Sequence, residues 1–306
     1  MVNSHAAVAE LGAIEAGGTK FACAVGTPAG HLIHETTIPT TTPEETLKQV
    51  IEFLRSHSRN LAAVGIGSFG PLQLNPGSAK YGYITSTPKP GWSNFDLAGT
   101  IRNAFHVPVI LDTDVNAAAL AESRWGAAQG LRTFLYGTVG TGIGGGAIVE
   151  GAILHGRTHP EMGHIRVPHD RSRDPFPGTC PYHENCLEGL ASGTALEARW
   201  KVSPATLPRN HPAWVLEAEY LALACVNWMC TLSPQRVILG GGVMQQKQLF
   251  PLICERVARL MNTYMDTSES ADNLGSFIVP SPLAGNAGLL GALALANCHT
   301  ASGNSS

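Results

Sequence analysis

The sequence predicts an α/β fold made of two related halves, and three observations support this. Short apolar segments typical of strands alternate with segments of helical period over the first 125 residues. A second cycle of the same kind begins near residue 133. In each cycle a turn rich in glycine and threonine joins two strands, so the halves are alike in pattern although not in identity. With 306 residues the chain is long enough to bury a substantial core.

The first half is expected to open with strands over 11–15 and 21–25 around a glycine turn. Thr42, Pro43 and Glu45 predict a helix start, because they supply an N-cap, a first-turn proline and a capping-box glutamate. The other elements expected here are strands over 61–66 and 107–111 and a helix over 115–125.

The second half contains a loop-rich insert over 155–186. The regular elements expected around it are strands over 133–139, 145–149 and 236–239 and helices over 187–200, 214–232 and 248–264. A helix of small residues over about 285–298 is expected to pack back on the N-terminal lobe. The predicted lobes therefore span 1–118 and 119–298, with a disordered tail over 299–306.

Composition argues against several classes of protein. Apolar residues make up 44% of the chain and charged residues 14%, as in soluble globular proteins rather than disordered ones. The net charge of −3 and the lack of a basic stripe argue against nucleic-acid binding. The apolar stretches over 221–232 and 287–296 are too short to span a bilayer, and the start of the chain lacks the pattern of a signal peptide. The sequence therefore favours a cytoplasmic protein with no nucleic-acid or membrane partner.

The turn Gly17-Gly18-Thr19-Lys20 is a candidate phosphate site. Glycines let the backbone approach an anion and turn its N–H groups inward, while Thr19 adds a hydroxyl and Lys20 a cation. The spacing is not that of a Walker loop. The glycines also join two strands, whereas those of a dinucleotide-binding fold open a helix. A plain hairpin turn is the alternative for this motif taken alone.

A second glycine turn, Gly140-Thr141-Gly142 with the four residues after it, strengthens this interpretation. It holds five glycines in seven residues, more than a structural turn needs at their cost in conformational entropy. Two such hairpins suit the binding of a nucleotide phosphate tail from both sides. Gly240-Gly241-Gly242 follows a buried strand and would leave flat backbone for an adenine ring, although glycines also serve helix–strand packing.

Asp114 is a candidate catalytic carboxylate. It lies where a buried strand passes into a helix, and strand ends of this kind face the ligand crevice of α/β folds. A helix N-cap is the alternative role for this side chain. Asp112 competes for the catalytic role, and spacing alone does not choose between the two.

Four residues of the types that bind zinc gather in the insert: His164, Cys180, His183 and Cys186. The Cys-x2-His-x2-Cys spacing places three ligands in one tight loop, and an upstream histidine supplies the fourth. Four nitrogen and sulfur ligands predict a closed tetrahedral zinc site of the structural kind. The histidines that compete by position for the fourth place are His155, His159 and His169.

Two glutamates flank the metal loop. Glu161 lies three residues before His164, and Glu188 lies two residues after Cys186. Carboxylates accept hydrogen bonds from vicinal hydroxyls, so both could bind a polyol, and simple exposure to solvent is the alternative.

Taken in order, these motifs resemble those of the ROK family, which comprises sugar kinases and repressors with the actin-like ATPase fold. The run 15–20 resembles the family's first phosphate motif, 112–118 its catalytic strand–helix junction, and 140–146 its second phosphate motif. The runs 161–164 and 180–193 resemble its sugar and zinc signature. The resemblance implies an actin-like (RNase H-like) fold with two lobes around a nucleotide and sugar cleft.

Within the family the resemblance is closest to bacterial fructokinases. The runs 67–71, 81–84 and 87–92 and the Cys-Pro-Tyr-His start of the metal loop are similar to that branch. Glucokinase-like members instead carry a Cys-x-Cys-Gly loop with three cysteines. The chain departs from the family at Thr113, where many members carry an asparagine that contacts the sugar.

The resemblance implies ATP-dependent phosphorylation of D-fructose to fructose 6-phosphate by a homodimer, with Mg²⁺ accompanying ATP and Zn²⁺ in the insert. Asp114 is the implied general base. The implied sugar ligands are Gly70, Thr113, Glu161, His164 and Glu188. The implied nucleotide ligands are Gly17, Gly18, Thr19, Lys20, Gly140, Thr141, Gly142, Gly240, Gly241 and Gly242. The implied zinc ligands are His164, Cys180, His183 and Cys186, so His164 would serve both metal and sugar.

Three alternatives remain at the level of sequence. A kinase for mannose or glucose belongs to the same class, since sugar epimers differ by single hydroxyls. A sugar-responsive repressor would need a helix-turn-helix module before the first phosphate motif, for which there is no room. A zinc-bound sugar-binding protein would not need Asp114 together with both hairpins.

Overall fold

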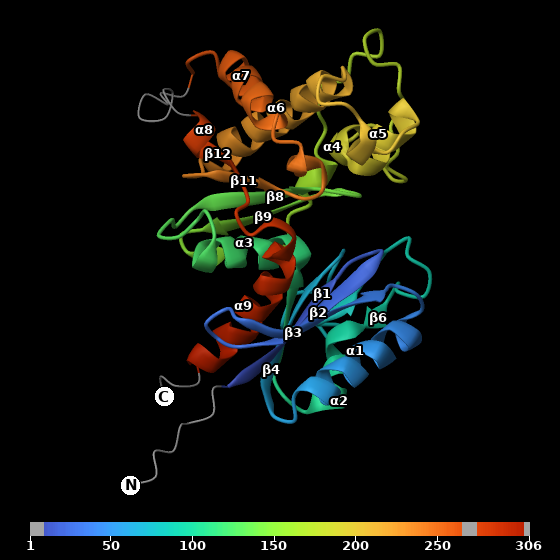
Figure 1. The fold of residues 1–306 in the computed structure, drawn as a ribbon, viewed down its shortest axis with the longest axis vertical. Helices are drawn as coiled ribbons and strands as arrows, with labels where there is room; N and C mark the ends of the chain where they lie inside the picture. The colour runs from blue at the N-terminus through green and yellow to red at the C-terminus, as the bar shows by residue number, and fades with distance from the viewer. Residues whose placement is uncertain (1–8, 265–273, 303–306) are drawn as a thin grey trace. The chain divides into compact units, whose positions relative to one another are not determined.

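The computed structural model describes residues 9–264 and 274–302 (Figure 1). The chain forms two compact units. Unit 1 comprises Met1–Trp125, His155–His159 and Asn286–Ser306, and unit 2 comprises Gly126–Leu154 and Pro160–Gly285. The chain therefore returns to unit 1 twice, once briefly at the start of the insert and once at its last helix.

Unit 1 is built on a five-stranded sheet with the order β3-β2-β1-β4-β7. The strands are β1 (Glu10–Ala16), β2 (Lys20–Gly26), β3 (Leu32–Pro39), β4 (Leu61–Ser68) and β7 (Val109–Thr113). β2 pairs antiparallel with both β1 and β3, while β1, β4 and β7 run parallel. Because parallel strands end at the same edge of a sheet, the turn after β1, the loop after β4 and the junction after β7 share one edge.

Different helices cover the two faces of this sheet. α1 (Pro43–His57) and α2 (Leu97–Phe105) share a core with Ile14 and Phe21. On the other face α9 (Ala287–Ser302) packs against β1 and β4 and contacts α3 (Asp114–Trp125). α1 starts as predicted, because Thr42 Oγ1 accepts the Glu45 N–H at 3.3 Å.

The segment 75–92 has no clear sequence period and is organised around the buried ring of Trp92. Trp92 Nε1 donates to the Thr41 carbonyl at 2.9 Å, and its ring centroid lies 5.2 Å from that of Phe21. β5 (Tyr83–Ile84) and β6 (Phe95–Asp96) pair on either side of it as a short antiparallel ladder. One buried indole thus stabilises a loop that lacks repeating structure.

Glycines set the distance between α9 and its neighbours. A Cβ at Gly65 of β4 would overlap the backbone of α9 at Ala292, and one at Gly291 would overlap the Ala117 carbonyl of α3. α9 is itself rich in alanine and glycine, so the backbones can approach closely. The helix runs to Ser302, and residues 303–306 of the predicted tail 299–306 lie outside the described residues.

Unit 2 repeats the strand arrangement of unit 1. Its sheet has the order β10-β9-β8-β11-β12, with β9 antiparallel to β8 and β10, and with β8, β11 and β12 parallel. The strands are β8 (Phe134–Val139), β9 (Ile143–Val149), β10 (Ala152–Ile153), β11 (Val237–Gly240) and β12 (Ile278–Pro280). Order and directions match those of unit 1 strand for strand, so the predicted α/β fold with two related halves is confirmed.

The helices of unit 2 are α4 (Leu187–Ala191), α5 (Gly193–Trp200), α6 (Ala213–Leu232), α7 (Leu249–Met261) and α8 (Leu274–Phe277). Short 3-10 turns lie at Met162–His164, Pro204–Thr206, Val243–Gln245 and Ala284–Asn286. The single helix predicted over 187–200 is in fact α4 followed by α5. Ser192 separates them, because its Oγ accepts the Ala195 N–H at 3.1 Å and caps the second helix.

α6 is the central helix of unit 2, and Trp214, Leu221 and Trp228 are buried along it. The apolar stretch 221–232 is part of this longer helix, which by length and composition alone could cross a membrane. The prediction that the apolar segment here is too short to span a bilayer was therefore wrong. Half of its apolar 18-residue window is buried inside the structure. A core helix of a globular unit can have the same composition, and Trp214, Leu221 and Trp228 belong to the buried core of unit 2.

Gly65→Ala should destabilise the protein, since the added methyl group must push α9 away from β4. Overpacking of this kind costs about 1–3 kcal/mol and should lower the melting temperature by several degrees, measured by scanning calorimetry. Gly77→Ala is the control, because its new Cβ would meet only Asn75 Oδ1 at an ordinary 3.4 Å. Equal melting temperatures for the two variants would contradict the close packing of α9.

Candidate functional site

The first glycine turn joins β1 to β2, as predicted. The Gly17 N–H donates to the Lys20 carbonyl at 3.0 Å, and Thr40 Oγ1 donates to the Gly17 carbonyl at 2.8 Å. A Cβ at Gly17 would lie 2.7 Å from the Lys20 carbonyl oxygen, whereas one at Gly18 would meet nothing. Gly18, Thr19 and Lys20 are exposed. Gly17 is therefore required by the turn itself, while the backbone beyond it is open to a ligand.

The junction after β7 is organised by Asp112. Its side chain is only 5% exposed, and its Oδ1 accepts the Thr113 N–H and the Asn116 Nδ2–H, each at 2.8 Å. Thr113 Oγ1 accepts the Asn116 N–H at 3.2 Å, so its hydroxyl caps the first turn of α3. Asp114 begins α3, is half-buried, and its Oδ1 accepts the Val115 N–H at 2.9 Å. The two aspartates named by the sequence thus have different surroundings.

The segment His155–His159 packs into unit 1 beside this junction. His155 Nε2 lies 2.9 Å from Asp112 Oδ2, and His159 Nε2 accepts the Leu72 N–H at 2.9 Å. A Cβ at Gly70 would lie 3.4 Å from the His159 ring, so the loop after β4 and this histidine are in contact. The hydrogen bond to Asp112 raises the pKa of His155, and partial burial opposes that rise. By sequence spacing, both histidines are possible fourth ligands of the metal quartet. In the structure, His155 instead pairs with Asp112 and His159 with the Leu72 N–H.

The second glycine turn joins β8 to β9 in unit 2, and two helices bind to it. The Gly193 N–H, at the start of α5, donates to the Gly140 carbonyl at 2.7 Å, and Thr194 Oγ1 donates to the Thr141 carbonyl at 2.8 Å. Glu188 Oε2, from α4, accepts the Ile143 N–H at 2.9 Å. Glu188 therefore holds the turn as well as being a candidate sugar ligand.

A pocket of about 460 Å³ opens beside this turn, within unit 2. Its lining residues are Gly140, Thr141, Gly193, Thr194, Glu197, Ser203, Pro204, Ala205, Gly242, Val243 and Gln246. Of the three consecutive glycines after β11, only Gly242 lines it. A Cβ at Gly240 would overlap the Tyr136 hydroxyl, and Gly241 has a φ of +93°, so these two glycines serve packing and backbone geometry.

Sequence reasoning missed most of this pocket wall. The residues it did not name are Thr194 and Glu197 of α5, the segment 203–205, and Val243 and Gln246. A local signal existed at Ser192-Gly193-Thr194, where an N-cap serine is followed by a glycine, but no spacing connects that capping motif to Gly140.

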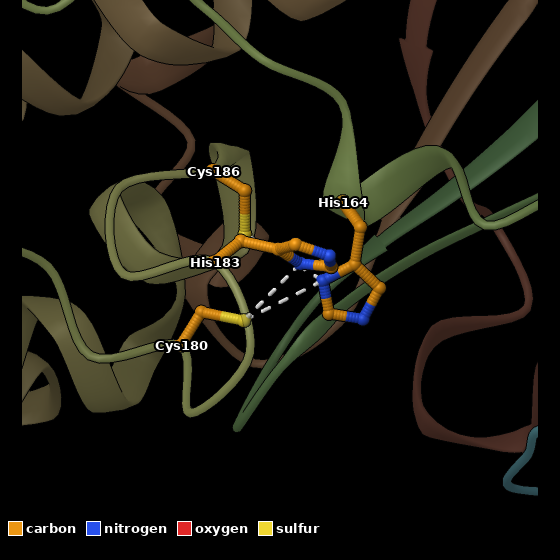
Figure 2. A group of neighbouring side chains, drawn as sticks. All are labelled: His164, Cys180, His183 and Cys186. Carbon is orange, nitrogen blue, oxygen red and sulfur yellow. Dashed lines mark hydrogen bonds between the residues drawn. The ribbon is translucent and has the colours of Figure 1, made fainter.

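The structure brings the predicted metal-ligand quartet together (Figure 2). The quartet is His164, Cys180, His183 and Cys186, and the ligand atoms all lie within 4.8 Å of one another. Cys180 Sγ lies 3.7 Å from His164 Nδ1 and 3.6 Å from His183 Nδ1, and Cys186 Sγ lies 3.5 Å from His164 Nδ1. Zn–S bonds of about 2.3 Å and Zn–N bonds of about 2.05 Å at tetrahedral angles give an S···N edge of about 3.6 Å. The donor atoms and their spacing therefore fit a zinc ion.

Tight backbone turns hold this quartet in place. His164 ends a 3-10 turn and Cys186 is the N-cap of α4, while the Cys180 and Glu184 backbones exchange hydrogen bonds of 3.2 and 2.9 Å. A Cβ at Gly189 would overlap the Glu184 carbonyl, so glycine is needed there for the loop to close. Burial raises the pKa of the Cys186 thiol to about 11, an effect that the Gly189 N–H partly offsets.

The other candidate ligands of the insert lie around the quartet. Glu161 is exposed, and its carbonyl accepts the His164 N–H at 3.0 Å. His169, the third rival ligand, has different partners: its Nε2 lies 2.9 Å from the Asp174 carbonyl and its Nδ1 lies 3.2 Å from Asn185 Nδ2.

Comparison with known proteins identifies the family. The model of the ROK family matches residues 11–299. The chain belongs to the ROK family. A relative from Bacillus subtilis is 50% identical over 287 residues, covering 94% of this chain and 95% of that one. A fructokinase from Pediococcus pentosaceus is 46% identical over 286 residues, covering 94% and 97%.

Solved structures agree with the ROK assignment. The ROK hexokinase of Thermus thermophilus superposes with a TM-score of 0.77 at 29% identity, covering 96% of this chain and 99% of that one. A ROK glucokinase from Streptomyces griseus, in complex with glucose and AMPPNP, has a TM-score of 0.74 at 24% identity and covers 94% and 99%. The ROK resemblance and the actin-like ATPase fold inferred from the sequence motifs are confirmed.

The His155–Asp112 pair should make stability depend on pH. Because folding raises the pKa of His155 above its unfolded value of about 6.5, the stabilisation is complete below that pH and is lost as pH rises through the folded pKa. Wild type should therefore melt at a higher temperature than His155→Gln in acid, and the difference should shrink as the pH becomes alkaline. His31→Gln, which replaces an exposed histidine, should show no such convergence. A difference that stays constant with pH would contradict the pairing.

Proposed function

We propose that the protein transfers the γ-phosphoryl group of ATP to D-fructose, giving fructose 6-phosphate and ADP. The observation that carries this proposal is the 46% identity with a fructokinase over nearly all of both chains. A fructokinase from Zymomonas mobilis, 44% identical over 295 residues, supports the same substrate. Cytoplasmic location and a homodimer are part of the proposal, and analytical ultracentrifugation tests the second.

The pocket in unit 2 is proposed as the nucleotide site. Its volume of about 460 Å³ lies in the range of small-molecule and cofactor pockets. The backbone at Gly140, Thr141 and Gly142 suits phosphate groups, while Gly242 and Val243 suit the adenine. The turn Gly17, Gly18, Thr19 and Lys20 is also proposed to bind phosphate, since most of it is exposed. Mg²⁺ accompanies ATP and offsets the negative charge of its phosphates.

Asp114 is proposed to accept the proton of the attacking hydroxyl. An aspartate with an ordinary pKa of about 3.9 is far too weak a base to form an alkoxide in advance. It therefore orients the hydroxyl and takes the proton late, as a loose phosphoryl-transfer transition state allows. Asp112 suits this role less well, because it is buried and both carboxylate oxygens already bond to Thr113, Asn116 and His155.

The quartet is proposed to bind Zn²⁺ as a structural ion. When bound, the ion cross-links an insert that otherwise has little core of its own. His164 and His183 turn Nδ1 toward the thiols, which leaves His164 Nε2 for another partner. The residues proposed to contact the sugar are Gly70, Thr113, Glu161, His164 and Glu188.

A kinase for another hexose is the second candidate, favoured by the 29% identity with the Thermus thermophilus ROK hexokinase. A coupled assay of ADP release over fructose, mannose, glucose and N-acetylhexosamines separates the two. Fructose should give the highest kcat/KM. A clear preference for glucose or mannose would replace the fructose proposal, and release of ADP with none of these sugars would reject it.

Asp114→Asn should lower kcat by several orders of magnitude and leave sugar binding nearly unchanged, because the amide still accepts a hydrogen bond but cannot take the proton. The same coupled assay gives kcat, and calorimetric titration gives the sugar affinity. Asp170→Asn, in an exposed turn of the insert, is the control and should retain wild-type rates. Near-normal turnover of Asp114→Asn would exclude it as the general base.

Cys180→Ser should release zinc, lower the melting temperature and raise the KM for the sugar, because the insert that carries Glu161 and His164 loses its cross-link. Metal content by elemental analysis and the melting temperature are measured first, and KM second. Cys230→Ser replaces an exposed cysteine of α6 and serves as the control. Full zinc content or an unchanged KM in Cys180→Ser would count against the proposed site.

A further inference from the structure

The helix α5 forms much of the wall of the unit 2 pocket, and it is held at both ends. Gly193 and Thr194, at its start, bond to the glycine turn at 2.7 and 2.8 Å. Glu197 and the residues 203–205 after the helix complete this wall. Eight residues make a helix of about 12 Å. Such a short helix moves as a rod, so a shift at its far end displaces the pocket wall.

Arg199 fixes the far end of α5. Its Nε and Nη2 donate to the two carboxylate oxygens of Asp174 at 3.2 and 3.1 Å, and the two side chains are only 8% and 5% exposed. The Tyr220 hydroxyl donates to Asp174 Oδ2 at 2.6 Å, and the guanidinium lies 4.4 Å from the Phe176 ring centroid. Bidentate pairs of this kind have a defined geometry, so Asp174 sets the position of Arg199 closely.

Asp174 belongs to the insert that carries the metal-ligand quartet, and a chain of contacts joins the two. His169 Nε2 lies 2.9 Å from the Asp174 carbonyl, and His169 Nδ1 lies 3.2 Å from Asn185 Nδ2. Arg166 Nη1 donates to Asn185 Oδ1 at 2.8 Å and to the His183 carbonyl at 2.9 Å. The backbone of one candidate metal ligand is therefore connected to the end of α5 through side chains of the insert.

We propose that the Arg199–Asp174 pair couples metal occupancy of the quartet to nucleotide affinity in the unit 2 pocket. The inference rests on the proposed function, because it takes the pocket as the nucleotide site and the quartet as a zinc site. Without the ion the loop that carries His183 and Asn185 relaxes, the contacts to Asp174 lose their geometry, and α5 shifts at its Arg199 end. Arg199 is a positioning residue, since it lines neither the pocket nor the quartet.

A second connection runs between the same regions, through Glu188. This residue follows Cys186 by two positions and bonds to the Ile143 N–H of the glycine turn. Substitutions at Arg199 leave that contact intact, so they separate the two connections. Coupling between two binding sites is reciprocal, so nucleotide should also hold the metal in place.

Calorimetric titration of MgADP into zinc-loaded and zinc-stripped wild-type protein measures the coupling. We expect the zinc-loaded protein to bind ADP about tenfold more tightly, a typical size for coupling between two sites. Competition for zinc with a chromogenic chelator at equilibrium gives a readout that is independent of activity, and saturating MgADP should lower the zinc Kd by the same factor.

The deciding variant is the double substitution Arg199→Met with Asp174→Asn, which removes both charges of the buried pair together. Because the connection through Glu188 remains, the double variant should lose most of the coupling but not all of it. Zinc should change its ADP affinity much less than in wild type, and MgADP should lower its zinc Kd less. Tyr220→Phe removes only the 2.6 Å hydrogen bond and should reduce the coupling in part, which keeps a measurement available if the double variant does not fold. Arg173→Met is the control: it lies on the same insert and removes an exposed ion pair with Glu219 of α6, so this variant should retain full coupling.

Coupling that survives unchanged in the double variant and in Tyr220→Phe would overturn the proposal. Equal ADP affinity of zinc-loaded and zinc-stripped wild type would do the same, and neither result would affect the fructokinase assignment. A wild type that phosphorylates no sugar and binds neither MgADP nor zinc would overturn the proposed function and this inference with it.

Discussion

The site in unit 2 depends on the close contacts that α4 and α5 make with the glycine turn between β8 and β9. The Gly193 N–H reaches the Gly140 carbonyl at 2.7 Å, and Glu188 Oε2 reaches the Ile143 N–H at 2.9 Å. A Cβ at Gly142 would lie 2.5 Å from that carboxylate oxygen. Gly142 therefore leaves room for the Glu188 carboxylate, and a Cβ there would push that carboxylate away from the Ile143 N–H.

The corresponding edge of unit 1 is organised by a buried carboxylate. Asp112 uses Oδ1 for the Thr113 N–H and the Asn116 amide and Oδ2 for His155. These bonds hold the end of β7 and the first turn of α3 in one arrangement, which leaves Asp114 at a defined position at the start of the helix. A rigid neighbour of this kind suits a residue whose proposed task is to orient a hydroxyl, because orientation fails when the supporting backbone moves.

The fold and the candidate site could be predicted from the sequence to different extents. Both glycine hairpins, the start of α1 and the Cys-x2-His-x2-Cys loop of the quartet are local patterns, in which the deciding residues lie within a few positions of each other, and the structure has them as predicted. The pocket wall on α5 and the partners of His155 and His159 were not predicted. The contacts that decide these span 43 to 87 residues of sequence, and no periodicity or capping rule reports on such distances. The expected single helix is split into α4 and α5 at Ser192, whose hydroxyl accepts the Ala195 N–H and so caps α5. The next residue, Gly193, bonds to the glycine hairpin.

By itself the sequence determined the α/β class, the repetition of one strand–turn–strand unit, and the spacing of three of the four quartet residues, because each of these follows from local stereochemistry and from short-range spacing. Only the tertiary structure decided which histidine completes the quartet, which of two neighbouring aspartates is buried against Thr113, Asn116 and His155, and which of three successive glycines faces a pocket. Those choices depend on what a distant strand or helix places opposite each side chain. The physical reason is that hydrogen-bond partners and empty volume are properties of packed elements, and packing is set by the whole fold.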